Sequence, residues 1–103
     1  MSKNQLDPII HAPIRLKICA FLVPLEDAEF QVLRDELGVS DSVLSKHASK
    51  LVEAGYLKLR KSSLNGRQHT WARLSSRGRK ALCAHVNALQ EIVSTVDASL
   101  TGN

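Results

Sequence analysis

The sequence predicts a mainly α-helical domain with a small β-hairpin, an α+β arrangement in a single unit spanning residues 1–103. Three observations support this prediction: apolar residues recur at helical spacing in four segments, two short runs alternate as strands do, and Asn65-Gly66 separates those runs. A length of 103 residues with 44% hydrophobic content suits one compact domain rather than two. Such a chain buries a modest core, and many chains of this size gain stability by oligomerising.

The first two helices are expected between residues 7 and 38. Either Asp7-Pro8 or His11–Pro13 can begin the first helix, because proline is tolerated in a first turn. After an extended connector, "AEF", the segment "QVLRDELG" predicts a brief second helix that ends at Gly38. Pro24 stops the first helix. The apolar stripes that face the core are Ile10, Ile14, Ile18, Phe21 and Leu22 in the first segment, and Leu33 and Leu37 in the second.

Ser40 is a good N-cap for a third helix, "DSVLSKHASKLVEA", which Gly55 terminates. Small polar and cationic side chains lie on its outer side, as a helix in the major groove of DNA requires: serines allow close approach and lysines neutralise phosphates. The alternative is a plain solvent-exposed surface. The expected buried stripe is Leu44, Ala48, Leu51 and Val52, and the candidates for DNA contact are Ser40, Ser42, Ser45, Lys46, Ser49 and Lys50.

A β-hairpin is expected after the third helix. "YLKLRK" alternates apolar and basic residues, and "HTWARL" is its expected partner strand. Asn65-Gly66 between them is a strong hairpin signal because both residues tolerate positive φ. The hairpin therefore places Arg67 at or beside an exposed tip, with Lys61 and Gln68 as supporting contacts. Trp71 is expected to pack beneath the hairpin or to line a small pocket.

Ser75 caps a last helix that can run to about Ser99 or Leu100. Its apolar residues follow alternating steps of four and three, the a/d pattern of a coiled coil. A lone domain of this size has little left to cover such a stripe, which favours a homodimer; the alternative is packing on the chain's own first helix. The chain then divides into a core of about residues 8–74 and a dimerisation helix of about residues 75–100, with contacts at Leu82, Val86, Leu89, Val93, Val96 and Leu100.

Charge is distributed unevenly along the chain. Residues 46–80 hold ten Lys or Arg and one acid, a net charge of +9, whereas the remaining residues carry −5, for a total of +4. Such segregation indicates one face built for a polyanion; a solvated basic face is the alternative.

The predicted order of elements is that of a winged helix-turn-helix, in which the third helix enters the major groove and the hairpin, or wing, reaches the backbone or the minor groove. "LRDELGVSDSVLSKHASKLVEAGYLKLRK" resembles the helix-turn-helix core of the MarR- and ArsR-type winged-helix regulators, with Ser45 and His47 in place and "LVEAGYL" entering the wing. "HAPIRLKICAFL" is similar to the family's first helix, including Arg15, and "ARLSSRGRKAL" resembles its return strand, with serine where threonine is usual. The resemblance covers roughly residues 6–90.

The resemblance implies a compact single-domain dimer, paired through its long C-terminal helix, that binds DNA sequence-specifically and typically represses transcription. Two departures bear on function. MarR-type wings commonly carry Asp-x-Arg, whereas Asn65-Gly66-Arg67 keeps the arginine without its orienting carboxylate. Metal-sensing ArsR-type members carry clustered cysteines or His/Asp pairs, and nothing in this sequence matches them.

The sequence lacks the patterns of an enzyme or a metal site. It has no Gly-rich phosphate loop, no metal-ligand spacing and no recognisable nucleophile and base, so we expect no catalytic activity, cofactor or metal. His47 is interpreted as a structural histidine. Cys19 and Cys83 do not make a disulfide framework and are interpreted as buried apolar residues, with a thiol switch at the dimer contact left open.

We therefore predict a homodimeric regulator, a repressor, that binds pseudo-palindromic double-stranded DNA in the cytoplasm, at the nucleoid. The alternative is a winged helix that docks an acidic protein partner. No run approaches the length of a membrane span and "MSKNQLDPII" has no signal-peptide core, so no membrane contact is expected. The pattern identifies no small-molecule effector.

Overall fold

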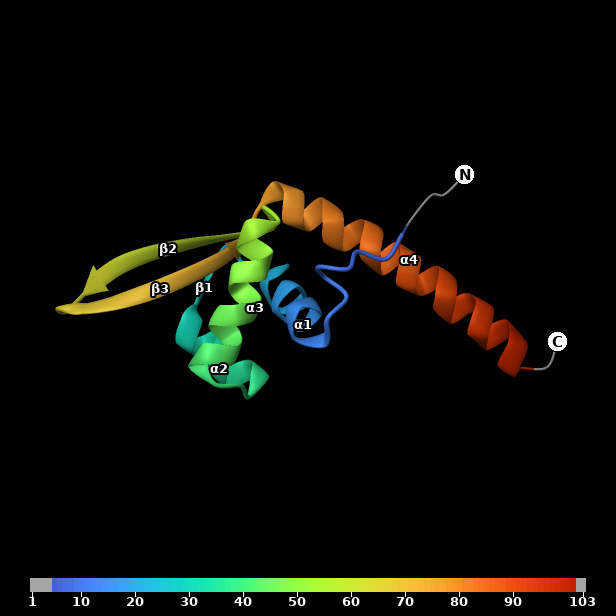
Figure 1. Cartoon of the computed structure of the whole chain (residues 1–103), viewed down its shortest axis with the longest axis horizontal. Coiled ribbons are helices and arrows are strands. Elements are labelled where there is room, and N and C mark those ends of the chain that lie inside the picture. The colour runs from blue at the N-terminus through green and yellow to red at the C-terminus, as the bar shows by residue number, and fades with distance from the viewer. Residues whose placement is uncertain (1–4, 102–103) are drawn as a thin grey trace.

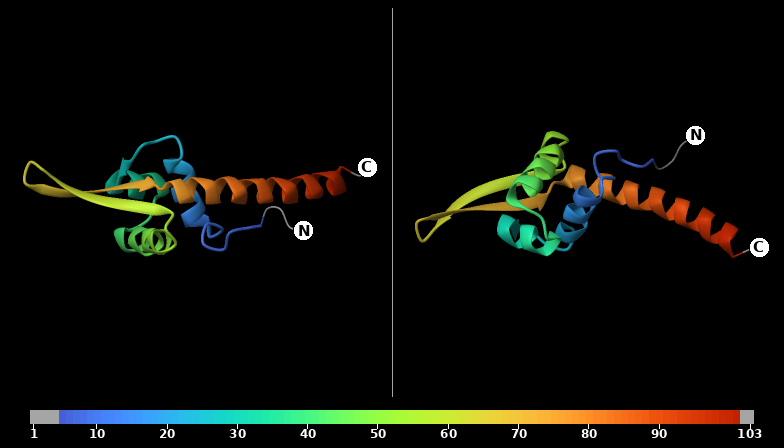
Figure 2. Two further views of the ribbon diagram at one scale, coloured as in Figure 1. Left: turned by 90° about the horizontal axis from the view of Figure 1, so that it is seen from above. Right: turned by 60° about the horizontal axis from the view of Figure 1, so that its bottom comes forward.

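The computed structural model describes residues 5–101, which form four helices and a three-stranded antiparallel sheet (Figure 1). The predicted mainly α-helical class with a β-hairpin is confirmed, and the sheet order is β1-β3-β2. The molecule measures 62 × 27 × 22 Å because the hairpin and the last helix project in opposite directions from a central body (Figures 1 and 2). The elements are α1 (Pro13–Leu22), β1 (Ala28–Glu29), α2 (Phe30–Leu37), α3 (Asp41–Glu53), β2 (Leu57–Leu64), β3 (Arg67–Leu74) and α4 (Ser76–Leu100).

The hydrophobic core lies between α1, α2 and α3 and one face of the sheet. Side chains alternate along a strand, so β2 and β3 turn Leu57, Ala72 and Leu74 to the helices. Ala28 of β1 pairs with Ala72 and is buried on the same face. The helices contribute the largest buried side chains, which include Ile18, Leu22, Leu33, Leu44 and Leu51.

The first helix begins at Pro13, so the second of the two predicted starts is correct. The preceding segment forms a turn in which the Asp7 carboxylate accepts hydrogen bonds from the backbone amides of Ile9, at 2.8 Å, and Ile10, at 3.2 Å. This turn carries Ile10 into the core, where it has no exposed surface. Ile10 therefore belongs to the apolar set although it precedes the helix.

The turn residues adopt the backbone conformations that the sequence predicts. Gly38 ends α2 in the left-handed region with φ 66°, and the hydroxyl of Ser40 then accepts from the amide of Val43 at the start of α3. Asn65 and Gly66 connect β2 to β3 with φ of 52° and 76°. A two-residue hairpin loop of type I′ requires positive φ at both positions, which is why Asn-Gly is favoured there.

Ser75 and Gly78 fix the start of α4 against the turn that follows α3. The Ser75 hydroxyl accepts from the amide of Gly78 at 2.9 Å and donates to the carbonyl of Gly55 at 2.6 Å. The amide of Ser75 donates to the carbonyl of Tyr56 at 3.0 Å. Gly78 packs so closely that a Cβ would lie 2.2 Å from the Tyr56 carbonyl oxygen. These contacts fix the direction in which α4 leaves the body.

A buried polar cluster forms a second attachment of α4. His85 has no exposed surface, and its Nδ1 accepts from the backbone amide of Asp7 at 2.9 Å. The Tyr56 hydroxyl donates to the Asp7 carboxylate at 2.6 Å, and His11 Nδ1 lies 3.5 Å from His85 Nε2. The N-terminal segment, the turn after α3 and α4 are thus joined at one point.

Two predictions of burial are wrong. Val52 is 40% exposed, because Leu44, Ala48 and Leu51 alone cover the contact of α3 with the core and Val52 lies beyond its edge. Cys83 is exposed, since it faces an open hollow of about 470 Å³ between α1 and α4. Cys19 is buried as expected, and burial raises the pKa of its thiol to about 11.

Candidate nucleic-acid interface

The outer side of α3 presents mainly polar and cationic side chains. The hydroxyls of Ser40 and Ser42 lie 3.2 Å apart at the start of the helix, beside the cap that Ser40 makes to Val43. Because one side of α3 is buried by its apolar stripe, the helical period leaves the polar residues in solvent. All six residues predicted to contact DNA from this helix are exposed: Ser40, Ser42, Ser45, Lys46, Ser49 and Lys50.

The position of α3 depends on Arg15 and His47. Arg15 Nη1 lies 3.0 Å from His47 Nδ1, and Arg15 also donates to the carbonyl of Ile9 at 2.5 Å. Burial, with the charges of Arg15 and Lys46, lowers the pKa of His47, so the neutral ring accepts from the guanidinium. His47 is therefore a structural residue that links α3 to α1. The exposed start of α3 is further held by an ion pair of 3.0 Å between Arg34 and Asp41.

The wing is a two-stranded ribbon that extends well beyond the helices (Figure 1). Arg67 follows the Asn65-Gly66 turn, is exposed, and forms no ion pair with a carboxylate of residues 5–101. Alternation along the strands separates the predicted wing contacts: Lys61 and Gln68 point to the side of the ribbon that bears the helices, whereas Arg67 belongs to the other side. The structure therefore does not bring the three wing residues to one face.

A hollow of about 300 Å³ lies between α3 and the wing. Its lining includes Ser45 and Gln68, so a predicted α3 contact and a predicted wing contact face the same space. Sequence reasoning missed two residues of this surface. Thr70 of β3 lines the hollow, and Val43 of α3 is 38% exposed beside the serines. The position of Val43, one residue before the buried Leu44, was the available signal.

The outer half of α4 carries an apolar surface that its own body leaves uncovered. Leu82 is buried in the chain's own core, and Leu89 is half-buried. The other four predicted contact residues, Val86, Val93, Val96 and Leu100, are exposed, with 54% of Val93 and 78% of Leu100 accessible. Ile92 was not predicted but is exposed beside them. The alternative in which the whole stripe packs on the first helix is therefore wrong, although the first turns of α4 do pack on the body.

Within residues 5–101, no three His, Cys, Asp or Glu side chains are grouped closely enough to hold a metal ion. Over the same part of the chain, no helix has both the length and the apolar character needed to cross a bilayer.

A capped helix with an exposed polar face, beside a projecting ribbon with a cationic tip, defines the class of winged-helix DNA-binding proteins. Residues 14–93 match the family model described as winged helix DNA-binding domain, and the chain belongs to this family. The predicted resemblance to winged-helix DNA-binding proteins is therefore confirmed.

Relatives support the same assignment across most of the chain. An uncharacterised protein of Methanocaldococcus jannaschii is 30% identical over 89 residues, which cover 86% of this chain and 97% of the relative. A transcriptional regulator homologue from Pyrococcus horikoshii superimposes with a TM-score of 0.82 at 24% identity, covering 88% of this chain and 90% of its own. NolR from Sinorhizobium fredii gives a TM-score of 0.65 at 28% identity, covering 82% and 77%.

Proposed function

We propose that the chain acts as a homodimer that binds a pseudo-palindromic operator and represses transcription, in the cytoplasm where DNA is accessible. One observation carries this proposal: the same chain combines an exposed groove-sized helix and wing with a terminal helix whose apolar stripe its own body does not cover. A two-fold dimer presents two copies of α3, and such dimers bind half-sites about 34–36 Å apart along the duplex.

Within each half-site, α3 is the element that enters the major groove. Its serines, Ser40, Ser42, Ser45 and Ser49, can reach base edges or phosphates with short hydroxyl groups. Lys46 and Lys50 lie on the same surface and neutralise phosphates. In the wing, Arg67 reaches the backbone or the minor groove, where negative potential favours arginine, and Lys61 and Gln68 support it from the other side of the ribbon.

The dimer contact follows from the exposed stripe of α4. Val86, Val93, Val96 and Leu100 are accessible, and Leu89 and Ile92 complete the surface. In a two-fold interface the same patch serves both subunits, so one continuous apolar stripe is sufficient. Leu82 supports the stripe from within the body.

The proposal is tested by the salt dependence of binding to duplex fragments selected from random DNA. A dimer with about six to ten phosphate contacts loses affinity by about a thousand-fold or more between 50 and 200 mM salt. Arg67→Ala should weaken binding to all sequences and lower the salt slope by about one. Lys17→Ala is the matched control, since it removes an exposed cation of α1 that lies outside the basic segment 46–80.

Binding that is unchanged in Arg67→Ala at every salt concentration would contradict the role of the wing. A chain that shows no preference for duplex DNA but retains an acidic protein would instead support the alternative, a winged helix used as a docking module.

A further inference from the structure

Arg15 of α1 joins the N-terminal turn to the helix that carries the predicted DNA contacts. Its Nε donates to the carbonyl of Ile9 at 2.5 Å, and its Nη1 donates to Nδ1 of His47 on α3 at 3.0 Å. A guanidinium cannot accept a hydrogen bond, so Nδ1 must be the acceptor and the ring carries its single proton on Nε2. This contact between α1 and α3 therefore exists only while His47 is neutral.

The carbonyl of Ile9 is itself held in place by Asp7. The Asp7 carboxylate accepts from two backbone amides of its own turn and from the hydroxyl of Tyr56, which lies just after α3. The backbone amide of Asp7 donates to the buried His85 of α4. The turn is thus anchored both to α4 and to the segment after α3, and it holds the Arg15 guanidinium in one position.

Protonation of His47 would turn this contact from attraction into repulsion. Burial lowers the pKa of His47, and so do the charges of Arg15 on α1 and Lys46 on its own helix. No carboxylate of residues 5–101 forms an ion pair with Arg15 or His47. A protonated ring would direct an N–H at the guanidinium, so a hydrogen bond would be replaced by two like charges in contact.

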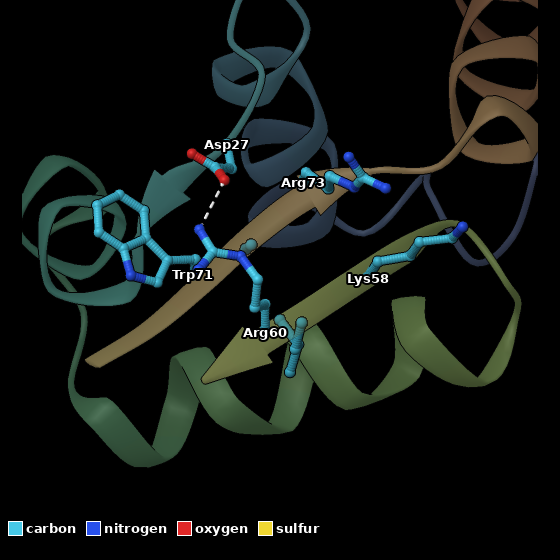
Figure 3. Close-up of a pocket in the computed structure, with 7 residues that line it drawn as sticks. Asp27, Lys58, Arg60, Trp71 and Arg73 are labelled. Atoms are coloured by element: carbon cyan, nitrogen blue, oxygen red, sulfur yellow. Dashed lines mark hydrogen bonds and ion pairs between the residues drawn. The ribbon is translucent and has the colours of Figure 1, made fainter. Parts of the chain in front are cut away.

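Arg60 of the wing has the partners that Arg15 lacks. Its Nη2 pairs with the Asp27 carboxylate at 3.0 Å, and its guanidinium carbon lies 5.4 Å from the centroid of the Trp71 ring (Figure 3). A carboxylate and an aromatic ring hold a guanidinium at any pH near neutrality. The Arg15 contact depends instead on the protonation state of a histidine.

We propose that Arg15 is a positioning residue for DNA recognition, which acts through neutral His47 to hold α3 in the orientation that specific binding requires. This inference rests on the proposed function, because it concerns the placement of the same α3 surface. His47 lies next to Lys46 and close in sequence to two of the predicted serine contacts, so a rotation of α3 at this point moves them all. Binding constellations must be held within about 0.5 Å of the productive geometry. Loss of the contact therefore lowers affinity for the preferred sequence, whereas nonspecific attraction to phosphates is retained.

The sign of the pH effect separates this role from general electrostatics. The chain has 4 histidines, so acidification adds positive charge and strengthens nonspecific attraction to phosphates. Loss of the Arg15 contact acts in the opposite direction. Affinity for the preferred sequence should fall as the pH drops below 6.5 through the lower pKa of folded His47, because only the neutral ring suits the bound state. The expected fall is about tenfold for each pH unit below that pKa.

The test compares the duplex selected from random DNA with a scrambled duplex of the same length, at about pH 7.5 and about pH 5 and at one salt concentration. Each affinity is corrected for the folded fraction of the full chain. The wild type should lose about tenfold of its preference for the selected duplex at the lower pH. His47→Asn puts an amide oxygen close to the position of Nδ1 and does not titrate. This variant should match the wild type at the higher pH and keep its preference at the lower pH.

Arg15→Lys keeps the positive charge, but one ammonium cannot replace a fork that reaches both the Ile9 carbonyl and His47. It should lose about tenfold of the preference already at the higher pH. Lys17→Arg, at an exposed position of α1, is the reciprocal exchange and should bind as the wild type does.

The inference is overturned if the wild-type preference is constant or rises on acidification, if His47→Asn loses it as the wild type does, or if Arg15→Lys retains it. If Arg15→Lys fails to fold, the pH profiles of the wild type and His47→Asn still decide. A wild-type chain that prefers no duplex at either pH would overturn the regulator proposal, and this inference with it. That result differs from a sequence preference that is present but independent of Arg15 and His47.

Discussion

The apolar pattern of α4 continues through both halves of the helix, but the two halves have very different surroundings. In residues 76–88, Gly78, Leu82, His85 and Ala88 are buried against the chain's own body. In residues 89–100 the apolar pattern continues, yet the helix extends past the body into solvent (Figure 1). Both halves belong to one continuous α-helix, so the difference lies in which side chains have neighbours.

This difference shows where the contacts between α4 and the rest of the chain end. The inner half is stabilised by tertiary contacts, whereas the outer half exposes apolar area whose burial is worth about 25 cal/mol per Å². Isolated helices of about a dozen residues are marginal in water, and exposed apolar patches mark interaction sites. This exposed apolar area supports the proposed homodimer, in which a second copy of the same stripe would cover it.

The largest effect is expected from charges placed in the outer half. Val93→Asp combined with Val96→Asp should raise the dimer dissociation constant by about a thousand-fold or more, because unpaired carboxylates would be buried in an apolar contact. Analytical ultracentrifugation measures this constant. Ser94→Asp is the control, since it adds one such charge at an exposed polar position in the same turns. A double variant that stays dimeric at nanomolar concentration would show that the outer half is not the contact.

The next largest effect is expected from a substitution in the inner half of α4. Gly78→Ala places a methyl group 2.2 Å from the Tyr56 carbonyl oxygen, which is backbone and cannot rotate away. We expect the free energy of unfolding to fall by about 3 kcal/mol, as overpacking against a rigid neighbour does. Urea denaturation measures it, with Asn87→Ala, an exposed site on α4, as the control. Wild-type stability in Gly78→Ala would mean that α4 does not approach this turn closely.

A smaller loss of stability is expected when the N-cap of α4 is removed. Ser75→Ala removes the acceptor for the Gly78 amide and the donor to the Gly55 carbonyl, so stability should fall by about 1–2 kcal/mol. Ser75→Thr keeps the hydroxyl and should recover much of the loss. Urea midpoints of the two variants give the comparison, and equal midpoints would contradict the proposed anchor.

The smallest effect is a pH dependence of the inner half. Burial and the neighbouring His11 lower the pKa of His85 below its ordinary 6.5, against the opposing charge of Asp7. The unfolded state then binds the proton more readily, so this contribution to stability is complete above pH 6.5 and is lost as the pH falls through the lower pKa of the folded state. Protonation of Nδ1 would also remove the acceptor for the Asp7 amide.

An NMR titration of the His85 ring, with urea unfolding at about pH 7 and pH 5.5, measures both quantities. A ring that titrates at or above 6.5 would contradict the buried neutral state. Titration of Asp7 does not interfere with this comparison, because its pKa lies below 3.8. Burial raises that pKa, but the hydrogen bonds from Tyr56 and from the amides of Ile9 and Ile10 have the larger, opposite effect.

Much of the fold was predictable because its signals act over a few residues. Gly38, Ser40 and Asn65-Gly66 each impose a local backbone conformation, and the helical period by itself separated the buried from the exposed side of α3. The six exposed α3 candidates follow from that period. Local patterns could not predict that Val52 lies outside the contact, because the width of a contact depends on the neighbouring elements.

The wing shows the same limit. The sequence located its tip, but the register across the ladder decides which residues share a side. The sequence therefore grouped Lys61 and Gln68 with Arg67, although these two residues lie on one side of the ribbon and Arg67 lies on the other. The same register makes Lys58 and Arg73 partners across the ladder, and likewise Arg60 and Trp71. No spacing within one strand indicates these pairs.

By itself, the sequence determined the order of the elements, the helix ends marked by Gly38, Ser40 and Ser75, the polar side of α3 and the apolar stripe of α4, since each depends on propensity and periodicity within one segment. Tertiary structure alone decided where the core stops covering that stripe, that Asp7 meets His85 across 78 positions, and that Arg60 lies on the Trp71 ring at the base of the wing. These features depend on distances between segments, and such distances are set when the core packs.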